Sequence, residues 1–284
     1  MVKIITDSVS DIPKEYIDRY DIKVLPLKVI FGDEVYRDGI DIDTKTMFDR
    51  LKSTNEYPTT SQVTPAEFEQ EFSEVVNSGN EVICITMSSA LSGTYNSALI
   101  ASREFDAAKI RVIDSKAITL GYGMIVIEAA KMASNGVGID DIESRVRDLV
   151  NNMEYLIIFD TLEYIYKGGR ISKSQYMMSN LLNIKVIMTM KDGQVVAREK
   201  VRGRKKAIKY IIDYIEKNES TLDGRVIGMN HANDESYLEE LKEAVLSKHL
   251  PSETIYSEVG CTVAAYSGLS AVALYYEKTK NNFI

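Results

Sequence analysis

Short apolar runs rich in valine and isoleucine alternate with amphipathic stretches along the first half of the chain. The runs lie at residues 2–6, 22–31, 81–86, 109–114 and 154–160. Between them, apolar residues recur at helical spacing, and we expect helices from Pro13 onward and over 65–76, 96–105 and 123–134. Strands that alternate with helices in this way predict a parallel sheet.

The pattern changes after Asp160. A tyrosine-rich stretch at 161–183 predicts a helix, and the turn Asp192-Gly193 between two alternating runs, 185–190 and 195–201, predicts an antiparallel hairpin. The remaining expected elements are a helix over 205–218, a strand over 225–230, a helix over 234–250, a strand over 253–260 and an apolar C-terminal segment. Because 284 residues exceed the usual single-domain length, we expect one domain over 1–160 and a second over 161–284.

Composition narrows the class of protein. The net charge of -8, with 45% hydrophobic and 27% charged residues, is ordinary for a soluble protein and argues against nucleic-acid or bilayer affinity. No apolar run is long enough to span a membrane, and the first residues resemble a strand rather than a leader, so we expect a cytoplasmic protein without integral membrane association. Cys84 and Cys261 are interpreted as reduced packing residues. His231 and His249 stand in unrelated contexts, and we expect no metal site.

Hydroxyl side chains gather where the expected strands end. The segment "SSALSGTYNSA", Ser88 to Ala98, follows the run at 81–86. A second cluster, "YPTTSQVTP", precedes the expected helix at 65–76, and a third polar end, "TDSVSD", follows the first strand. Ligands of parallel α/β sheets bind outside the carboxyl ends of the strands, so the three clusters could converge on one site.

Four roles compete for these hydroxyls. The first is that of helix caps and turn formers, which they are in most proteins. The second and third, a nucleophilic serine and a phosphate cradle, lack the GxSxG pattern and the glycine motifs that they require. The fourth is that Thr60, Ser92 and the helix start at Gly93 donate hydrogen bonds to a carboxylate, whose burial without partners would be prohibitively costly.

Five segments, "TDSVSDIP", "PTTSQVTPAEF", "SSALSGTYNSA", "DSKAITLGYGM" and "TLEYIYKGGRIS", occur in this order between Thr6 and Ser172. Read together they resemble the DegV family of bacterial fatty-acid-binding proteins. The resemblance implies an α/β/α parallel-sheet N-terminal domain and a two-layer α/β C-terminal domain with a mixed sheet. It also implies a long-chain fatty acid, such as palmitate, in a tunnel between the domains, with no cofactor and no catalytic residue.

The resemblance further implies roles for single residues. Thr60 and Ser92 match the threonine and serine that hold the fatty-acid carboxylate in the family's "TSQ" and "LSGTY" motifs. The expected neighbours of this headgroup are Ser61, Gly93, Thr94, Arg170 and Tyr266. Some members are the acyl-carrying subunit of a fatty acid kinase, and Arg202 matches an arginine near which the kinase subunit acts. The expected role is therefore that of a lipid carrier in fatty acid metabolism.

The C-terminal segment departs from the family pattern. It reads "GCTVAAYSGLSAVA", whereas kinase-coupled members typically carry a "GPVIGTHxGPGALG"-like segment, so Tyr266 replaces the family histidine. A tyrosine donates a hydrogen bond but is neither a proton acceptor nor a cation near pH 7. Headgroup binding is compatible with this change, whereas kinase coupling and the choice of acyl chain are left open.

Two further points stay open at this stage. Met177, Met178, Leu181 and Leu182 recur at helical spacing and would line either an acyl tunnel or an ordinary core. Two other functions compete with the carrier: a serine-dependent acyl hydrolase and a lipid-responsive regulator.

Overall fold

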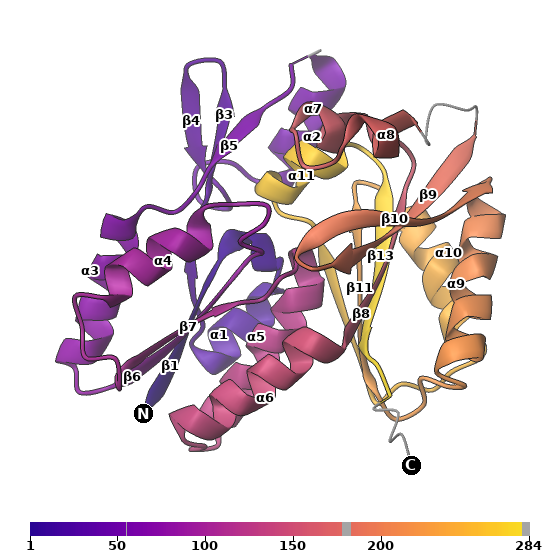
Figure 1. Cartoon of the computed structure of the whole chain (residues 1–284). Coiled ribbons are helices and arrows are strands. Elements are labelled where there is room, and N and C mark those ends of the chain that lie inside the picture. The colour runs from indigo at the N-terminus through magenta and orange to yellow at the C-terminus, as the bar shows by residue number, and fades with distance from the viewer. Residues whose placement is uncertain (55, 178–182, 280–284) are drawn as a thin grey trace.

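Two β-sheets stand side by side in the computed structural model, which describes residues 1–54, 56–177 and 183–279 (Figure 1). Four strands form the first sheet, six form the second, and a small third sheet has three strands. The sheets share one large hydrophobic core, and a smaller core lies on the far face of the second sheet.

The first sheet is parallel throughout, with the strand order β2-β1-β6-β7, which confirms the sheet expected for the first half of the chain. Its strands are β1 (Val2–Asp7), β2 (Lys23–Leu25), β6 (Glu81–Thr86) and β7 (Ile110–Asp114). Helices α3 (Pro65–Asn77) and α4 (Thr94–Ser102) lie on one side of it, and α1 (Lys14–Tyr20), α5 (Thr119–Ser134) and α6 (Ile139–Asn152) lie on the other (Figure 1). The strands thus end at the polar segments that the sequence singled out.

The expected single strand over 22–31 is wrong. Pro26 interrupts it, because proline has no backbone N–H to donate to a sheet. The chain enters the first sheet as β2 and leaves it to form the third sheet, with the order β4-β3-β5. The strands of the third sheet are β3 (Lys28–Phe31), β4 (Glu34–Arg37) and β5 (Thr59–Ser61), and α2 (Thr44–Ser53) follows β4.

The second sheet is mixed, with the order β10-β9-β8-β13-β11-β12. Only β11 and β12 pair in parallel, and the expected hairpin at Asp192-Gly193 joins β9 to β10. Its strands are β8 (Met153–Phe159), β9 (Ile184–Lys191), β10 (Gln194–Arg202), β11 (Val226–Ala232), β12 (Glu253–Glu258) and β13 (Ala271–Glu277). Helices α9 (Arg204–Asn218) and α10 (Glu235–Leu246) pack on one face, which gives the expected two-layer arrangement.

Strand β8 does not belong to the parallel sheet in which its apolar run was expected. It lies between β9 and β13 in the mixed sheet. All seven of its residues are buried, and a run that is apolar on both faces does not indicate which sheet will take it up. The division of the chain at residue 161 stays a prediction.

The tyrosine-rich stretch is less helical than expected. Within its described residues it forms two short helices, α7 (Glu163–Lys167) and α8 (Lys173–Tyr176), and the segment between them begins with Gly168 and Gly169. Gly169 has a φ of +75°, a backbone angle that ends α7 and that other residues rarely adopt. Met177 is 62% exposed, and Met178, Leu181 and Leu182 lie outside the described residues.

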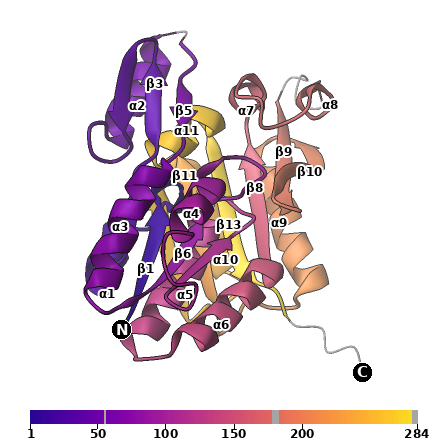
Figure 2. The same cartoon turned by 60° about the vertical axis from the view of Figure 1, so that its left-hand side comes forward.

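The C-terminal apolar segment forms one short helix, α11 (Cys261–Ser267), followed by β13. Figure 2 shows α11 between the third sheet and α7, and it contacts both. Asp38 fixes the start of this helix, because its carboxylate accepts hydrogen bonds from the backbone amides of Cys261 at 2.9 Å and Thr262 at 3.0 Å. Residues far apart in the sequence are thereby held around one helix.

Candidate functional site

A cavity of about 70 Å³ lies between the two large sheets, at the carboxyl ends of the parallel strands. We call it the inter-sheet cavity. Its polar lining residues are Thr60 of β5, Ser92 before α4, Arg170 after α7 and Thr262, Tyr266 and Ser267 of α11. The rest of its wall is apolar and includes Val9, Leu27, Met87 and Phe159. Four residues that the sequence analysis placed at the headgroup, Thr60, Ser92, Arg170 and Tyr266, therefore line one cavity.

Thr60 and Tyr266 are in direct contact. The Thr60 Oγ1 atom and the Tyr266 hydroxyl oxygen are 2.6 Å apart and share a hydrogen bond. The Arg170 guanidinium lies over the Tyr266 ring, 4.8 Å from its centroid. A Cβ at Gly168 would lie 2.4 Å from the Tyr266 ring, so only glycine permits this approach. Sequence reasoning named Tyr266, and the glycine pair before Arg170 in "KGGRIS" indicated a close backbone approach, but the ring that Gly168 approaches is seen only in the structure.

Ser92 stands at the start of α4. Its Oγ lies 2.9 Å from the Thr94 Oγ1 and accepts a hydrogen bond from the Thr94 backbone amide at 3.3 Å. Thr94 is fully buried. At Gly93, a Cβ would lie 1.9 Å from the Gln62 side chain, so the glycine allows the two loops to approach closely. Ser92 thus supports the local turn and lines the cavity as well.

Arg170 is the cation of the inter-sheet cavity. Its Nε donates a hydrogen bond to the Leu91 carbonyl at 3.3 Å, and its Nη1 donates to the Gly168 carbonyl. No ion pair joins Arg170 to a carboxylate within the described part of the chain. A guanidinium has five N–H donors, so it retains hydrogen-bonding capacity toward the cavity.

The other predicted residues lie outside this lining. Ser61 follows Thr60 on β5, and neighbouring side chains of a strand point to opposite faces. Ser88 donates a hydrogen bond to the Gly193 carbonyl at the hairpin tip at 2.6 Å, and Ser89 donates one to Asp114 at 2.5 Å. Arg202 is exposed at the last position of β10, whereas Val195, which lines the cavity, lies near the first position of the same strand.

A smaller cavity of about 30 Å³ continues from the inter-sheet cavity, with which it shares Ile118, Phe159, Val263 and Ser267. Its wall is mostly apolar and ends on a chain of hydrogen bonds. Tyr275 donates to Asn230 at 3.0 Å, Asn230 donates to Thr119 at 2.6 Å, and Thr119 donates to Asp11 at 2.5 Å. The two cavities together form a narrow apolar path that is closed by a polar network.

Three carboxylates near this path are held by neutral donors. Asp7 accepts hydrogen bonds from Tyr122 at 2.6 Å and from two backbone amides, and Asp11 accepts from Thr119 and the Gly260 amide. Burial raises the pKa of Asp7 to about 6 and raises that of Asp11 well above its ordinary range. Asp38 accepts from Ser8 and from the amides of α11. Hydroxyls and amides thus hold carboxylates repeatedly in this fold.

The inter-sheet cavity also has an outer neighbour, a cavity of about 140 Å³ that shares Thr60, Arg170 and Tyr266 with it. We call it the mouth cavity. It is lined in addition by Tyr57, Tyr164 and Lys167, and the Lys167 ammonium lies 3.5 Å from the centroid of the Tyr57 ring. Tyr57 and Lys167 are exposed, so the polar end of the inter-sheet cavity lies close to the molecular surface.

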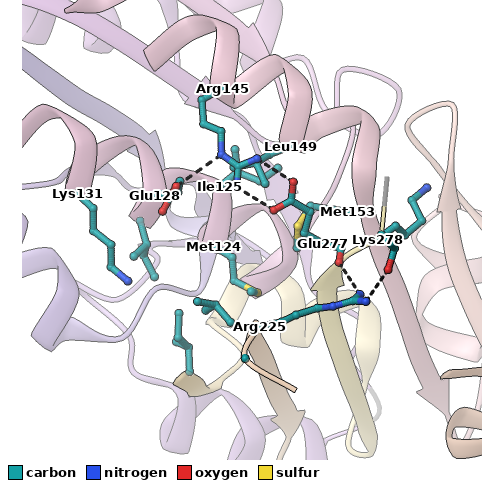
Figure 3. A pocket seen from close by; sticks show the side chains of 15 residues that line it. Met124, Ile125, Glu128, Lys131, Arg145, Leu149, Met153, Arg225, Glu277 and Lys278 are labelled. Atoms are coloured by element: carbon teal, nitrogen blue, oxygen red, sulfur yellow. Dashed lines mark hydrogen bonds and ion pairs between the residues drawn. The ribbon is translucent and has the colours of Figure 1, made fainter. Parts of the chain in front are cut away.

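A cavity of about 510 Å³ lies elsewhere, between α5, α6 and the ends of β11 and β13 (Figure 3). We call it the ion-pair cavity. Arg145 donates two hydrogen bonds of 2.8 Å to the carboxylate of Glu277, and Arg225 donates one of 2.8 Å to Glu219. None of the residues that the sequence analysis selected lines it. Arg145 and Arg225 hold distant segments together here, because both are already paired with carboxylates.

Within residues 1–54, 56–177 and 183–279, no group of three or more histidine, cysteine, aspartate or glutamate side chains is placed to hold a metal ion. None of the helices in these ranges combines the length and apolar character that crossing a bilayer requires.

Comparison with known proteins gives consistent matches over the whole fold. Residues 1–279 match a family model described as "Uncharacterised protein, DegV family". A DegV domain-containing protein of Caldanaerobacter subterraneus subsp. tengcongensis is 39% identical over 277 residues, which cover 98% of this chain and 99% of that relative.

Solved structures also resemble the chain over nearly its whole length. One from Thermus thermophilus, described as fatty acid binding of a DegV family protein, has a TM-score of 0.90 at 29% identity and covers 98% of this chain and 99% of its own. Another, from Eubacterium ventriosum, is described as a stearic acid-binding protein; it has a TM-score of 0.86 at 26% identity and covers 98% of each chain.

Proposed function

Because the chain belongs to the DegV family, we propose that it binds a long-chain fatty acid such as palmitate, with the carboxylate held by Thr60 and Ser92. One observation carries the proposal: hydroxyls from two distant segments, with Arg170 and Tyr266, line the polar end of an otherwise apolar path between the sheets. Solved relatives described as fatty-acid-binding proteins support the same ligand class.

Neutral donors suit this carboxylate. A buried carboxylate needs hydrogen bonds to offset its lost hydration, and hydroxyls supply them without forming a tight ion pair. Asp7 and Asp11 are held in the same manner a short distance away in the fold. The fatty-acid carboxylate would therefore accept hydrogen bonds from neutral donors, as the carboxylates of Asp7 and Asp11 do.

The acyl chain would supply most of the affinity. Burial of ~14 methylenes at ~0.8 kcal/mol each gives roughly 11 kcal/mol, before the losses from ordering the chain and from association. The two cavities of about 70 and 30 Å³ are small beside ligand pockets of ~300 Å³ or more. We therefore infer that a bound chain displaces side chains along the path and widens it into a tunnel between the sheets.

The geometry favours a carrier over a serine hydrolase. Neither His231 nor His249 lines the inter-sheet cavity, so Ser92 has no histidine base beside it. His249 is instead buried beside Thr221 and Leu222. A carrier needs only to bind the acid and to keep its carboxyl end accessible.

The proposal includes presentation of the acid to a partner enzyme, such as a fatty acid kinase. The mouth cavity supports it, because it places the proposed headgroup residues close to the surface. Arg202, exposed on β10, is the proposed contact for the partner. A kinase assay with lipid-loaded protein and ATP tests this step: we expect acyl phosphate, and a lower yield with Arg202→Ala. Lipid that is never phosphorylated by any fatty acid kinase from the same cell would contradict it.

Native mass spectrometry of the purified chain tests the carrier itself. We expect a non-covalent fatty acid that is released intact on denaturation. A covalent acyl adduct on Ser92, or turnover of added acyl esters, would support the hydrolase instead. Protein that neither co-purifies with fatty acid nor takes it up on addition would refute the proposal.

A further inference from the structure

The hydroxyl of Thr262 differs from the other hydroxyls of the inter-sheet cavity in its hydrogen bonding. Thr262 is 3% exposed and lines this cavity. Its backbone amide donates to Asp38, whereas its Oγ1 has no hydrogen-bond partner among the described residues. A buried hydroxyl without a partner costs roughly 1–3 kcal/mol, so such groups in a folded protein require an explanation.

The neighbouring hydroxyls have protein partners. Thr60 pairs with Tyr266, Ser92 pairs with Thr94, and Ser267 donates to the Gly268 carbonyl at 3.4 Å. The polar network at the closed end of the path is likewise joined throughout by hydrogen bonds. Within the described part of this path, Thr262 therefore offers both a donor and an acceptor that the protein itself does not use.

The position of Thr262 relative to the headgroup follows from the helix. Thr262 and Tyr266 are four residues apart on α11, so they lie on the same face, about 6 Å apart along the axis. Tyr266 contacts Thr60 at the proposed carboxylate site. A ligand held there would pass Thr262 within the first few carbons of its chain.

We infer that the preferred ligand is a hydroxylated fatty acid, with the hydroxyl on one of the carbons close to the carboxylate. This inference rests on the proposed fatty-acid-binding function and names the class of acid. The ligand hydroxyl accepts a hydrogen bond from Thr262 Oγ1 or donates one to it, and both buried groups are then satisfied. An unsubstituted chain leaves the threonine hydroxyl unpaired against methylene groups.

Competition binding tests the preference. Hexadecanoate is compared with hexadecanoates hydroxylated at successive carbons next to the carboxylate and with the acid hydroxylated at the far end of the chain. We expect one of the carboxyl-proximal acids to bind roughly 3–10-fold more tightly than the unsubstituted acid, the gain typical of a buried neutral hydrogen bond. The acid hydroxylated at the far end should show no gain.

Variants of one cavity wall supply the controls. Thr262→Val replaces the hydroxyl by a methyl group and should remove the preference while hexadecanoate binding is kept or improved. Thr262→Ser should retain it, which guards against a valine variant that folds poorly. Ser267→Ala removes a partnered hydroxyl from the same cavity and should also retain it.

The outcomes separate the two claims. Equal affinities for all acids, or a preference that persists in Thr262→Val, would overturn the inference and leave fatty-acid binding in place. Failure of every acid to bind would overturn the proposed function, and the inference with it.

Discussion

The ion-pair cavity and the inter-sheet cavity differ in how far their polar groups are already paired within the protein. The ion-pair cavity is larger, at about 510 Å³, but Arg145 is engaged by Glu277 and Arg225 by Glu219. The inter-sheet cavity is smaller, at about 70 Å³, but it is lined by hydroxyls and by the Arg170 guanidinium, which forms no ion pair within the described residues. Cavity volume alone therefore does not single out the proposed binding site. Polar groups that still have donors or acceptors without a protein partner indicate it better.

The carboxylates beside the two cavities also differ in the groups that donate hydrogen bonds to them. Glu277 faces a guanidinium, which compensates its charge. Asp7, next to residues that line the inter-sheet cavity, has only neutral donors, and burial raises its pKa to about 6. One region is held together by charge pairs. The other holds its buried carboxyl group with hydroxyls and backbone amides.

The largest expected effect comes from removing the two proposed carboxylate ligands. Thr60→Val combined with Ser92→Ala deletes two hydrogen bonds to a charged group, each worth ~1.5–3 kcal/mol. Fatty-acid affinity should fall by roughly 10²–10⁴-fold, as measured by calorimetry or probe displacement. The matched control, Ser61→Ala with Ser89→Ala, removes two hydroxyls outside the cavity and should leave affinity unchanged. Full affinity in the first variant would refute the headgroup assignment.

Titration of Asp7 is the next largest effect, and it acts on stability. Between pH 3.8 and about 6 the unfolded chain loses the proton of Asp7 while the folded protein keeps it, so the free energy of unfolding falls as the pH rises. Asp7→Asn does not titrate. The stability of the wild type relative to this variant should therefore decrease by about 2 kcal/mol from pH 4 to pH 7, because one pKa unit corresponds to ~1.4 kcal/mol and part of the loss already occurs below pH 4.

Denaturant unfolding at several pH values measures this difference. Asp33→Asn, which changes an exposed aspartate, serves as the control and should show a much smaller pH dependence. A difference that is constant with pH would show that Asp7 is ionised in the folded protein throughout this range.

A third change sharpens the description of the inter-sheet cavity. Tyr266→Phe removes the hydroxyl that contacts Thr60 and keeps the ring under the Arg170 guanidinium. We expect fatty-acid affinity to fall about 3–10-fold, the value of one neutral hydrogen bond. Tyr164→Phe, a matched change in the mouth cavity, should have less effect. Equal losses in both variants would argue that Tyr266 acts through the mouth rather than at the headgroup.

The smallest effect is expected in the ion-pair cavity. Glu277→Gln weakens a pair that is about one-third exposed, and we expect a loss of stability of ~1 kcal/mol in thermal or denaturant unfolding. Fatty-acid affinity should not change, because no proposed ligand contact lies in this cavity. A large loss of binding in this variant would erase the distinction between the two regions.

The sequence predicted the fold well where local patterns suffice. The parallel strands and the hairpin at Asp192-Gly193 follow from periodicity and turn chemistry. Helix α6 was missed although Ile142, Val146 and Leu149 recur at helical spacing on its buried face. The sheet to which β8 belongs could not be predicted, because the sequence of a strand that is buried on both faces does not indicate which strands pair with it.

The candidate site divides in the same way. Short motifs, together with a family resemblance, selected Thr60, Ser92, Arg170 and Tyr266, and the structure brings all four to one cavity. Composition alone did not separate Ser92 from Ser88, because both are serines in one hydroxyl-rich loop; the resemblance to the family's "LSGTY" motif selected Ser92. Their difference lies in their surroundings: Ser88 is buried against the Gly193 carbonyl, while Ser92 lines the cavity.

The sequence by itself determined which residue types stand at the strand ends and where the elements alternate. Only the tertiary structure decided which hydroxyls are already satisfied by the protein. Thr262 shows why. Its backbone amide donates a hydrogen bond to Asp38 and its side chain is buried. Its hydroxyl lacks a partner because of the position at which α11 packs against the other elements. Hydrogen-bond satisfaction depends on contacts between segments that are distant along the chain, and no local pattern records them.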